Sequence, residues 1–183
     1  MRDAVNSLSL YFHPMPISIV AIQDIPALVQ LLNNAYRGEE SKKGWTSEAD
    51  MVGGDIRTDE TNMKELMRQR GAVFLKYTNE EHEIRGCVFL HERESKLYLG
   101  MLSVSPSLQT KGIGKQLMTA AEQYARQKAC PAIFMRVISL RHELIAWYER
   151  QGYYKTGETQ AFDNTKFGTA KLPIEFVMLQ KDL

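Results

Sequence analysis

Two segments of the chain repeat their apolar residues at the three- and four-residue intervals of a helix that buries one face. The first set is Leu28, Leu31, Leu32 and Ala35, and the second is Ile113, Leu117, Ala121 and Tyr124. Asp24 is placed to cap the first helix, which we expect to end before Gly38. Two further helices are predicted over about residues 60–69 and 141–151, the second ending at Gly152 in a left-handed cap.

Short runs rich in β-branched and aromatic residues lie between these helices and predict strands. They cover residues 17–22, 72–77, 84–92, 97–104, 132–138, 153–156 and 174–180. We expect loops over the polar stretch 37–59 and over the segment 157–173. Residues 1–16 show no clear period. The order β-α-α-β-β-β-α-β-α-β-β is typical of a chain that mixes helices with one sheet.

Composition narrows the class of protein further. The chain has 183 residues, of which 44% are hydrophobic and 25% charged, so we expect one globular domain. A net charge of +1 argues against nucleic-acid binding through bulk charge. Cys87 and Cys130 form no readable disulfide framework, which favours a reducing cytoplasm. Because no apolar run approaches the length of a membrane span and the start does not read as a signal peptide, we expect a cytoplasmic protein without a membrane partner.

The strand over residues 97–104 leads through a proline into a turn that can bind phosphate. Gly112 and Gly114 place N–H groups at the start of a helix, where the macrodipole adds positive charge, and Lys111 and Lys115 flank them. The turn has neither the spacing of a P-loop nor the third glycine of a dinucleotide fingerprint. Two spaced glycines also occur in tight connections that bind nothing, so a plain strand-to-helix turn is the alternative interpretation.

Two motifs in order connect this turn to a known family. The segment from Val104 through Gln109 to Gly114 resembles motif A of the GNAT superfamily of N-acetyltransferases, in which Gln/Arg-x-x-Gly-x-Gly/Ala binds the pyrophosphate of acetyl-CoA. The segment from Ala146 to Gly152, followed by a tyrosine, is similar to that family's helix with its closing glycine and aromatic pair. The resemblance covers about residues 17 to 183 and names no acceptor.

The resemblance implies a fold and a domain organisation. The fold is α/β (α+β), with a mixed, mostly antiparallel central sheet of six to seven strands and helices on both faces. The sheet is expected to splay at the middle, between the strands over residues 97–104 and 132–138, and to admit a thioester there. Residues 17–183 are expected to form a single domain, and residues 1–16 an N-terminal arm.

The cosubstrate that the resemblance implies is acetyl-CoA. Its pyrophosphate and pantetheine would be held by Leu102, Ser103, Val104, Gln109, Thr110, Lys111, Gly112, Ile113, Gly114 and Lys115. A helix N-terminus with two lysines suits the phosphate charges independently of the family. We expect no metal, because the four histidines lack the spacing of metal ligands.

Acyl transfer to an amine needs a neutral nucleophile, a stabilised oxyanion and a proton for the departing thiolate. Tyr148 matches the tyrosine that family members often place near the sulfur of CoA, and it is our candidate general acid; buried packing is its alternative role. Tyr98 and Arg136 stand where relatives carry carboxylates, so the usual base is missing. Glu143 is the candidate base, although an acid in the first turn of a helix also compensates the helix dipole.

The acceptor cleft of the family is usually walled by the segment after the first helix and by the loop between the last two strands. The candidate substrate residues are Trp45, Arg136 and Phe162. The acids around Trp45 would suit a cationic amine, and they are Glu39, Glu40, Glu48, Asp50 and Asp55. A solvated polar loop that Trp45 anchors to the body is the alternative interpretation. Arg136 would instead suit a carboxylate on the acceptor.

The sequence therefore predicts an N-acetyltransferase that acts by direct transfer on a primary amine of a small molecule, amino acid or peptide. A non-catalytic acyl-CoA sensor is the alternative. Homodimers are common in the family, so the resemblance also implies one here.

Overall fold

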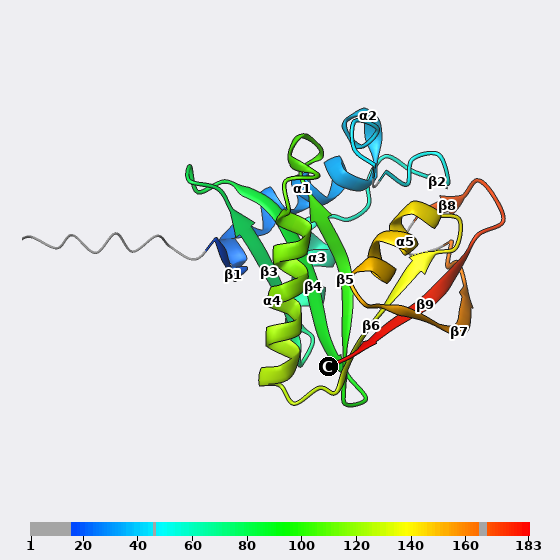
Figure 1. Ribbon diagram of the computed structural model, residues 1–183. Coiled ribbons are helices and arrows are strands. Elements are labelled where there is room, and N and C mark those ends of the chain that lie inside the picture. The colour runs from blue at the N-terminus through cyan, green and yellow to red at the C-terminus, as the bar shows by residue number, and fades with distance from the viewer. Residues whose placement is uncertain (1–15, 46, 165–167) are drawn as a thin grey trace, which may run out of the picture.

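The computed structural model describes residues 16–45, 47–164 and 168–183, and a seven-stranded sheet runs through it (Figure 1). The strand order is β1-β3-β4-β5-β6-β9-β7. The strands are β1 (Ile17–Ile19), β3 (Ala72–Thr78), β4 (Ile84–Arg93), β5 (Lys96–Val104), β6 (Ala132–Ile138), β7 (Tyr154–Ala161) and β9 (Glu175–Asp182). All neighbouring strands are antiparallel except β5 and β6. The predicted mixed, mostly antiparallel sheet is confirmed.

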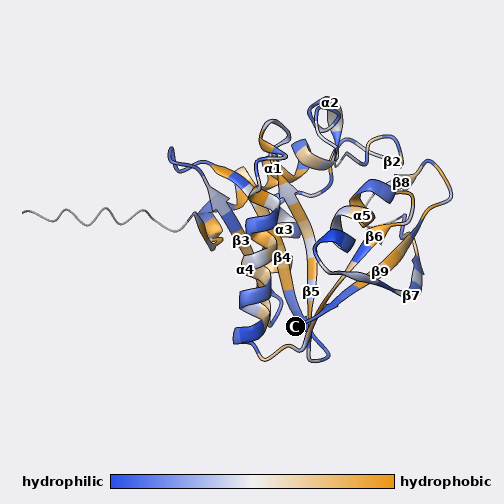
Figure 2. Ribbon diagram, in the orientation of Figure 1, coloured by the Kyte–Doolittle hydropathy of each residue, from blue (hydrophilic) through white to orange (hydrophobic). Residues whose placement is uncertain are grey.

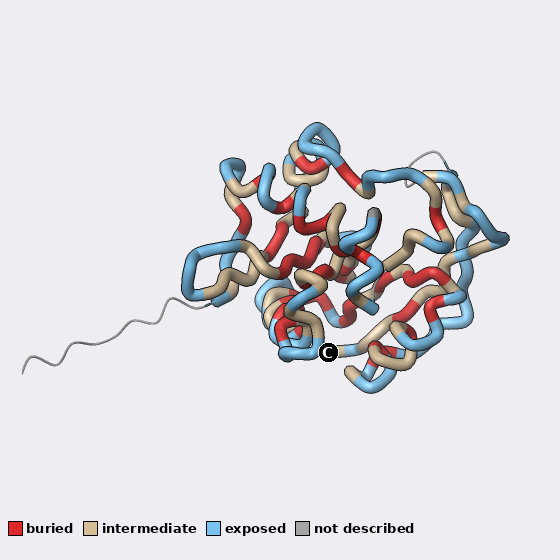
Figure 3. The backbone as a smooth tube through the Cα atoms, turned by 90° about the horizontal axis from the view of Figure 1, so that it is seen from above, coloured by how far each residue is buried: buried red, intermediate tan, exposed pale blue. Residues whose placement is uncertain are grey.

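Helices cover both faces of this sheet. On one face lie α1 (Ile25–Tyr36) and α3 (Glu60–Arg68), and on the other lie α4 (Ile113–Gln127) and α5 (His142–Arg150). The shorter elements are the 3-10 turns η1 (Ile22–Asp24) and η2 (Pro106–Leu108), helix α2 (Gly38–Ser41), and the pair β2 (Val52–Gly53) with β8 (Thr169–Ala170). Seen from above in Figure 3, buried residues occupy the middle of the molecule and exposed residues its outside.

Side chains that alternate along β4 build two separate cores. Cys87 and Phe89 join the cluster under α1 and α3, whereas Val88 and Leu90 join the cluster under α4 and α5. This two-residue period is what a strand with both faces covered requires. The helices present their own apolar stripes to these clusters, and the hydrophobic colour of Figure 2 gathers on the central strands accordingly.

The sheet splits between β5 and β6, as the family resemblance implies. These two strands pair only at Leu97 with Ile133 and at Tyr98 with Phe134, and they diverge beyond that point. A bulge lies just past the divergence, because two steps along β4, from Cys87 to Phe89, oppose three steps along β5, from Ser103 to Gly100. Met101, within the bulge, has a φ of 49°. The rest of β5 therefore has no strand partner on the β6 side, which leaves backbone groups for a ligand.

The first strand and the helix cap differ from the prediction. The strand predicted over residues 17–22 stops at Ile19 and the chain turns into η1. The Asp24 carboxylate does not cap α1. It accepts a hydrogen bond from the Ala21 N–H at 2.8 Å and one from Lys76 Nζ at 2.5 Å. Asp24 itself has helical backbone angles, so its side chain points back to η1 and towards the lysine on β3.

Two predicted loops contain regular structure. Helix α2 and strand β2 lie in the polar stretch after α1, and the segment 157–173 carries the end of β7 and all of β8. The strands among them form through pairing with partners elsewhere in the chain, β9 for β7 and β8 for β2, and not through an apolar period of their own. The arm predicted over residues 1–16 lies outside the described residues apart from Pro16.

No helix within the described part of the chain is both long enough and apolar enough to span a bilayer.

Asp24 gives a pH-dependent test of this fold. Burial opposes ionisation of its carboxyl group, but the hydrogen bonds from Lys76 and from the Ala21 N–H lower its pKa below the ordinary 3.8. Since the pKa is lower in the folded state, the ionised carboxylate stabilises the fold above about pH 3.8, and this contribution is lost as the pH falls through the folded-state pKa. We expect Asp24→Asn to lower the free energy of unfolding by about 1 kcal/mol at pH 7, and by less at pH 3, where the carboxyl group of the unfolded chain is largely protonated. Urea unfolding at both pH values measures it, and an equal loss at both would contradict the assignment.

Candidate active site

Two cavities meet at the split in the sheet. The larger has a volume of about 330 Å³ and lies between the start of α4, the end of β5 and α5. The smaller has a volume of about 90 Å³ and lies between β5, β6 and α1. Four residues line both cavities: Tyr36, Leu102, Leu144 and Tyr148. A molecule in one cavity can therefore reach a molecule in the other at these residues.

The turn before α4 offers bare N–H groups to the larger cavity. Gly112 has a φ of 82°, a conformation that favours glycine, and the first helical hydrogen bond runs from the Gln116 N–H to the Gly112 carbonyl at 3.0 Å. The N–H groups of Ile113, Gly114 and Lys115 consequently form no hydrogen bond within the described residues. Such groups, at the positive end of a fifteen-residue helix, suit a phosphate.

The predicted cofactor residues gather around the larger cavity, with two exceptions. Those that line it are Leu102, Val104, Gln109, Thr110, Gly112, Ile113, Gly114 and Lys115. Ser103 is buried and its hydroxyl donates to the Met101 carbonyl at 3.3 Å. Lys111 is exposed beside the turn and is not among the lining residues.

Gln109 fastens a distant segment onto this turn. Its Oε1 accepts a hydrogen bond from the Trp45 N–H at 2.9 Å, and its Nε2 donates to the Val104 carbonyl at 3.3 Å. The Trp45 ring packs edge-on against Trp147 with centroids 6.3 Å apart, and Arg141 Nη2 donates to the Trp45 carbonyl at 3.2 Å. Trp45, predicted to contact the acceptor, thus lines the larger cavity and not the smaller one. No local pattern in the sequence indicates this clamp, because Trp45 and Gln109 lie 64 residues apart.

Tyr148 lies at the junction of the cavities with its hydroxyl available. The side chain is 6% exposed, and its hydroxyl forms no hydrogen bond within the described part of the chain. Burial raises the pKa of the phenol well above its ordinary value of 10, so the group is protonated at neutral pH.

Tyr36, which sequence reasoning missed, also lies at the junction of the cavities, but the proton of its hydroxyl is engaged in a hydrogen bond. Burial raises its pKa to about 12, and its hydroxyl donates to the Leu102 carbonyl at 3.2 Å. Its place at the end of α1 reads in sequence as one more apolar position of an amphipathic helix.

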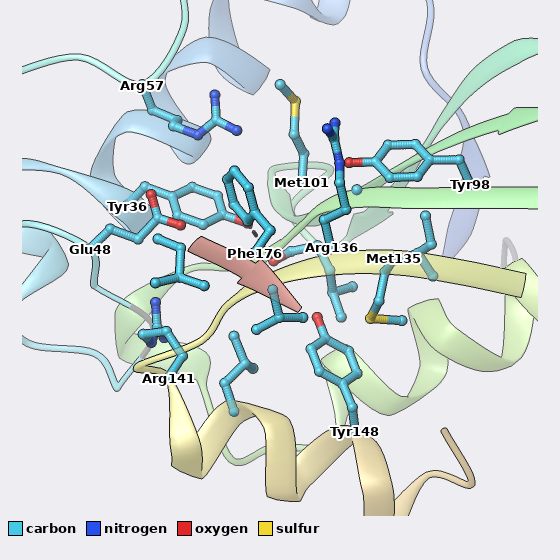
Figure 4. Close-up of a pocket in the computed structure, with 16 residues that line it drawn as sticks. Tyr36, Glu48, Arg57, Tyr98, Met101, Met135, Arg136, Arg141, Tyr148 and Phe176 are labelled. Atoms are coloured by element: carbon cyan, nitrogen blue, oxygen red, sulfur yellow. Dashed lines mark hydrogen bonds between the residues drawn. The ribbon is translucent and has the colours of Figure 1, made fainter. Parts of the chain in front are cut away.

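The remaining predicted residues fall in different places. Arg136 lines the smaller cavity (Figure 4). Phe162 does not line the smaller cavity. It stacks on Phe176, which does, and the two ring centroids are 5.4 Å apart. Glu143 is exposed in the first turn of α5 and lines neither cavity, so its predicted role as base has no geometric support.

The acid that does line the smaller cavity is Glu48. Its Oε2 pairs with Nη1 of the buried Arg37 at 2.8 Å, and its side chain is 16% exposed. Oε1 forms no hydrogen bond within the described residues, which leaves it available to a ligand. Sequence reasoning placed Glu48 among several loop acids but could not single it out, because the ion pair that positions it is tertiary.

Comparison with known proteins agrees with this geometry. The model of the acetyltransferase (GNAT) family matches residues 26–153. Human N-acetyltransferase 8 is 27% identical over 125 residues, which cover 65% of this chain and 54% of that protein. The chain thus spans a little over half the length of this curated relative.

Solved structures share the fold at low sequence identity. The ribosomal-protein-alanine N-acetyltransferase from Brucella melitensis superposes with a TM-score of 0.70 at 18% identity, over 92% of this chain and 100% of that one. The structure of yncA from Salmonella typhimurium, solved with its cofactor acetyl-CoA, superposes with a TM-score of 0.66 at 18% identity, over 91% and 92% of the two chains.

The Gln109 clamp makes a prediction about the segment that carries Trp45. Gln109→Ala removes both of the hydrogen bonds described above, so we expect the exposed Trp45 ring to loosen and its fluorescence to be quenched faster by acrylamide. The measurement is made in a Trp147→Phe background, so that one tryptophan reports. Gln151→Ala, which trims the same cavity without touching Trp45, is the control. Equal quenching in the two variants would count against the clamp.

Proposed function

Because the chain belongs to the GNAT acetyltransferase family, we propose that it transfers the acetyl group of acetyl-CoA directly to a primary amine. The observation that carries this proposal is the meeting of two cavities at Tyr36, Leu102, Leu144 and Tyr148, where the sheet splits. The larger cavity takes acetyl-CoA and the smaller takes the amine. The thioester then lies at the residues that both cavities share.

The larger cavity offers binding partners for the phosphates and the amides of a CoA molecule. The unpaired N–H groups that open α4, with Lys115 beside them, suit the pyrophosphate. The free edge of β5 beyond Tyr98 offers backbone groups to the amides of pantetheine, as a neighbouring strand would. The acetyl-CoA in the structure of yncA, which shares this fold, supports the choice of ligand.

The chemistry needs three contributions from the chain. The amine nitrogen forms a bond to the acetyl carbon while the bond from that carbon to sulfur breaks. A backbone N–H on the free edge of β5 near Leu102 stabilises the negative charge on the carbonyl oxygen. Tyr148 donates its proton to the departing sulfur, since its hydroxyl is protonated and unengaged.

An amine that arrives as an ammonium group loses one proton before the attack and a second as the amide forms. Among the described residues, Glu48 is the carboxylate that lines the smaller cavity, and its Oε1 is available to bind the ammonium group and accept the first proton. The second proton restores the Tyr148 phenolate, which has given its own proton to the sulfur. The proposal uses Glu48 in place of Glu143, which lies outside both cavities.

A substitution in the phosphate turn tests the cofactor cavity. Gly112 is a poor position for it, because its positive φ would strain any other residue. Gly114 has no such strain, and a Cβ there would meet Trp147 only at 3.8 Å. We expect Gly114→Val to fill the cavity and weaken CoA binding at least tenfold by calorimetry, with little change in melting temperature. Thr119→Val, exposed on the same helix, is the control. CoA affinity equal to the parent's would contradict the assignment.

A pair of tyrosines tests the proton donor. We expect Tyr148→Phe to lower kcat for thiol release from acetyl-CoA by about a hundredfold or more. Tyr153→Phe is the matched control, because the centroid of its ring lies 6.0 Å from that of Tyr148. The Tyr153 hydroxyl is buried, has no hydrogen-bond partner among the described residues, and lines neither cavity. This control variant should leave kcat unchanged and leave stability equal or higher. Unchanged turnover in Tyr148→Phe would remove the residue from this role, and tight CoA binding with no turnover on any amine would favour the acyl-CoA sensor.

A further inference from the structure

The charges around the smaller cavity are unevenly balanced. Among the residues that the structure describes, Arg57, Arg136 and Arg141 line it together with one carboxylate, that of Glu48. That carboxylate is already paired with the buried Arg37, which offsets its charge. A cavity with this excess of guanidinium groups disfavours an acceptor that brings only positive charge, and it favours one that also brings an anion.

Arg136 is the best placed of these groups to bind an anion. Its guanidinium lies over the rings of Tyr98 and Phe176, at 5.4 and 5.7 Å from their centroids, so the side chain is held in one orientation. Nη1 donates to Gln160 Oε1 at 2.8 Å, and no carboxylate within the described residues pairs with Arg136. Its other N–H groups are therefore left for a ligand, and a guanidinium is suited to bind a carboxylate through two parallel hydrogen bonds.

The positions of the charges match the two ends of a zwitterion. In the view of Figure 4 the guanidinium groups of Arg57 and Arg136 lie on the opposite side of the pocket from the Tyr148 hydroxyl. An acceptor that binds its anion at these arginines extends from them towards Tyr148, where the thioester lies in the proposed function. The cavity volume of about 90 Å³, against 330 Å³ for the cofactor cavity, suits a small molecule.

We propose that the acceptor is a small amine that also carries a carboxylate, of the α-amino acid class, and that Arg136 binds this carboxylate while Glu48 receives the ammonium group. The inference rests on the proposed function, because it places the amine in the smaller cavity. It goes further by assigning the part of the acceptor that does not react.

The substrate class is tested with matched pairs of acceptors. The standard α-amino acids are compared with their carboxamides, which keep the amine and the side chain but lack the negative charge, by thiol release from acetyl-CoA. The amine of a carboxamide is the more easily deprotonated of the two, so chemistry alone favours the amide. We expect the free acid to have the higher kcat/KM for the side chains that the cavity accepts. Equal or faster transfer to the amides would overturn the inference and leave the proposed function standing.

Arg136 is tested with a control on the same ring. Arg136→Gln should raise KM for the amino acid by about ten- to a hundredfold, with a small change in kcat and none in KM for the amide. Arg93→Gln should change neither value, because Arg93 lies over the Tyr98 ring, 4.5 Å from its centroid, without lining the cavity. A loss that is the same for acid and amide, or the same in both variants, would overturn the role of Arg136.

A binding measurement keeps this test separate from the transfer reaction. Calorimetry with the same amino acids and amides, on the protein with and without CoA, reports occupation of the smaller cavity whether or not an acetyl group moves. The inference is supported if the free acid binds, if Arg136→Gln abolishes this binding and if Arg93→Gln preserves it. This holds even where no amine is acetylated, since the lack of acetylation overturns the proposed function alone. No preference for the acid in binding or in transfer overturns the inference.

Discussion

The parting of β5 from β6 is the constraint on which the rest of the site depends. Two strands that pair at only two positions leave a gap in the middle of an otherwise continuous sheet. Unpaired backbone in a protein interior is costly, so such a gap persists only where other groups use it. Here the bulge at Met101 turns the end of β5, α4 and α5 cover one side, and the two cavities meet within the gap. The same feature that weakens the sheet exposes the backbone groups that a cofactor can pair with.

The Gln109 clamp relates the two cavities to each other. Gln109 belongs to the turn that offers N–H groups to a phosphate, and its side chain holds the segment that carries Trp45. Three residues further along that segment, Glu48 lines the smaller cavity. Residues of this segment therefore contribute to the walls of both cavities, Trp45 to the larger and Glu48 to the smaller. Glu48 is held in addition by its ion pair with Arg37.

Sequence reasoning predicted most of the fold because the apolar period is strong in the helices and strands that bury a whole face in the core. Helix α4 begins at Ile113 and β6 runs over residues 132–138, as the pattern indicates. It was wrong where a side chain had a better partner far away, as at Asp24, whose carboxylate bonds to Lys76 across the sheet. It also missed α2, β2 and β8, whose residues have no apolar period and are positioned by tertiary contacts. The local hydrophobic pattern predicts elements that bury a continuous face, and it does not predict elements that lack such a face.

The same difference separates the two halves of the candidate site. The turn proposed to bind the cofactor could be located in the sequence because its N–H groups belong to the backbone, and the local pattern of two glycines before an amphipathic helix marks it. The acceptor cavity could not, because α1, β5, β6 and β9 supply its walls, and its balance of charge depends on which arginines happen to face inwards. Considered alone, Arg136 indicates a carboxylate on the acceptor, whereas the acids of the loop indicate a cationic amine. Placed together in one small cavity, with Glu48 held by Arg37, they no longer conflict, since a molecule with an amine at one end and a carboxylate at the other satisfies both.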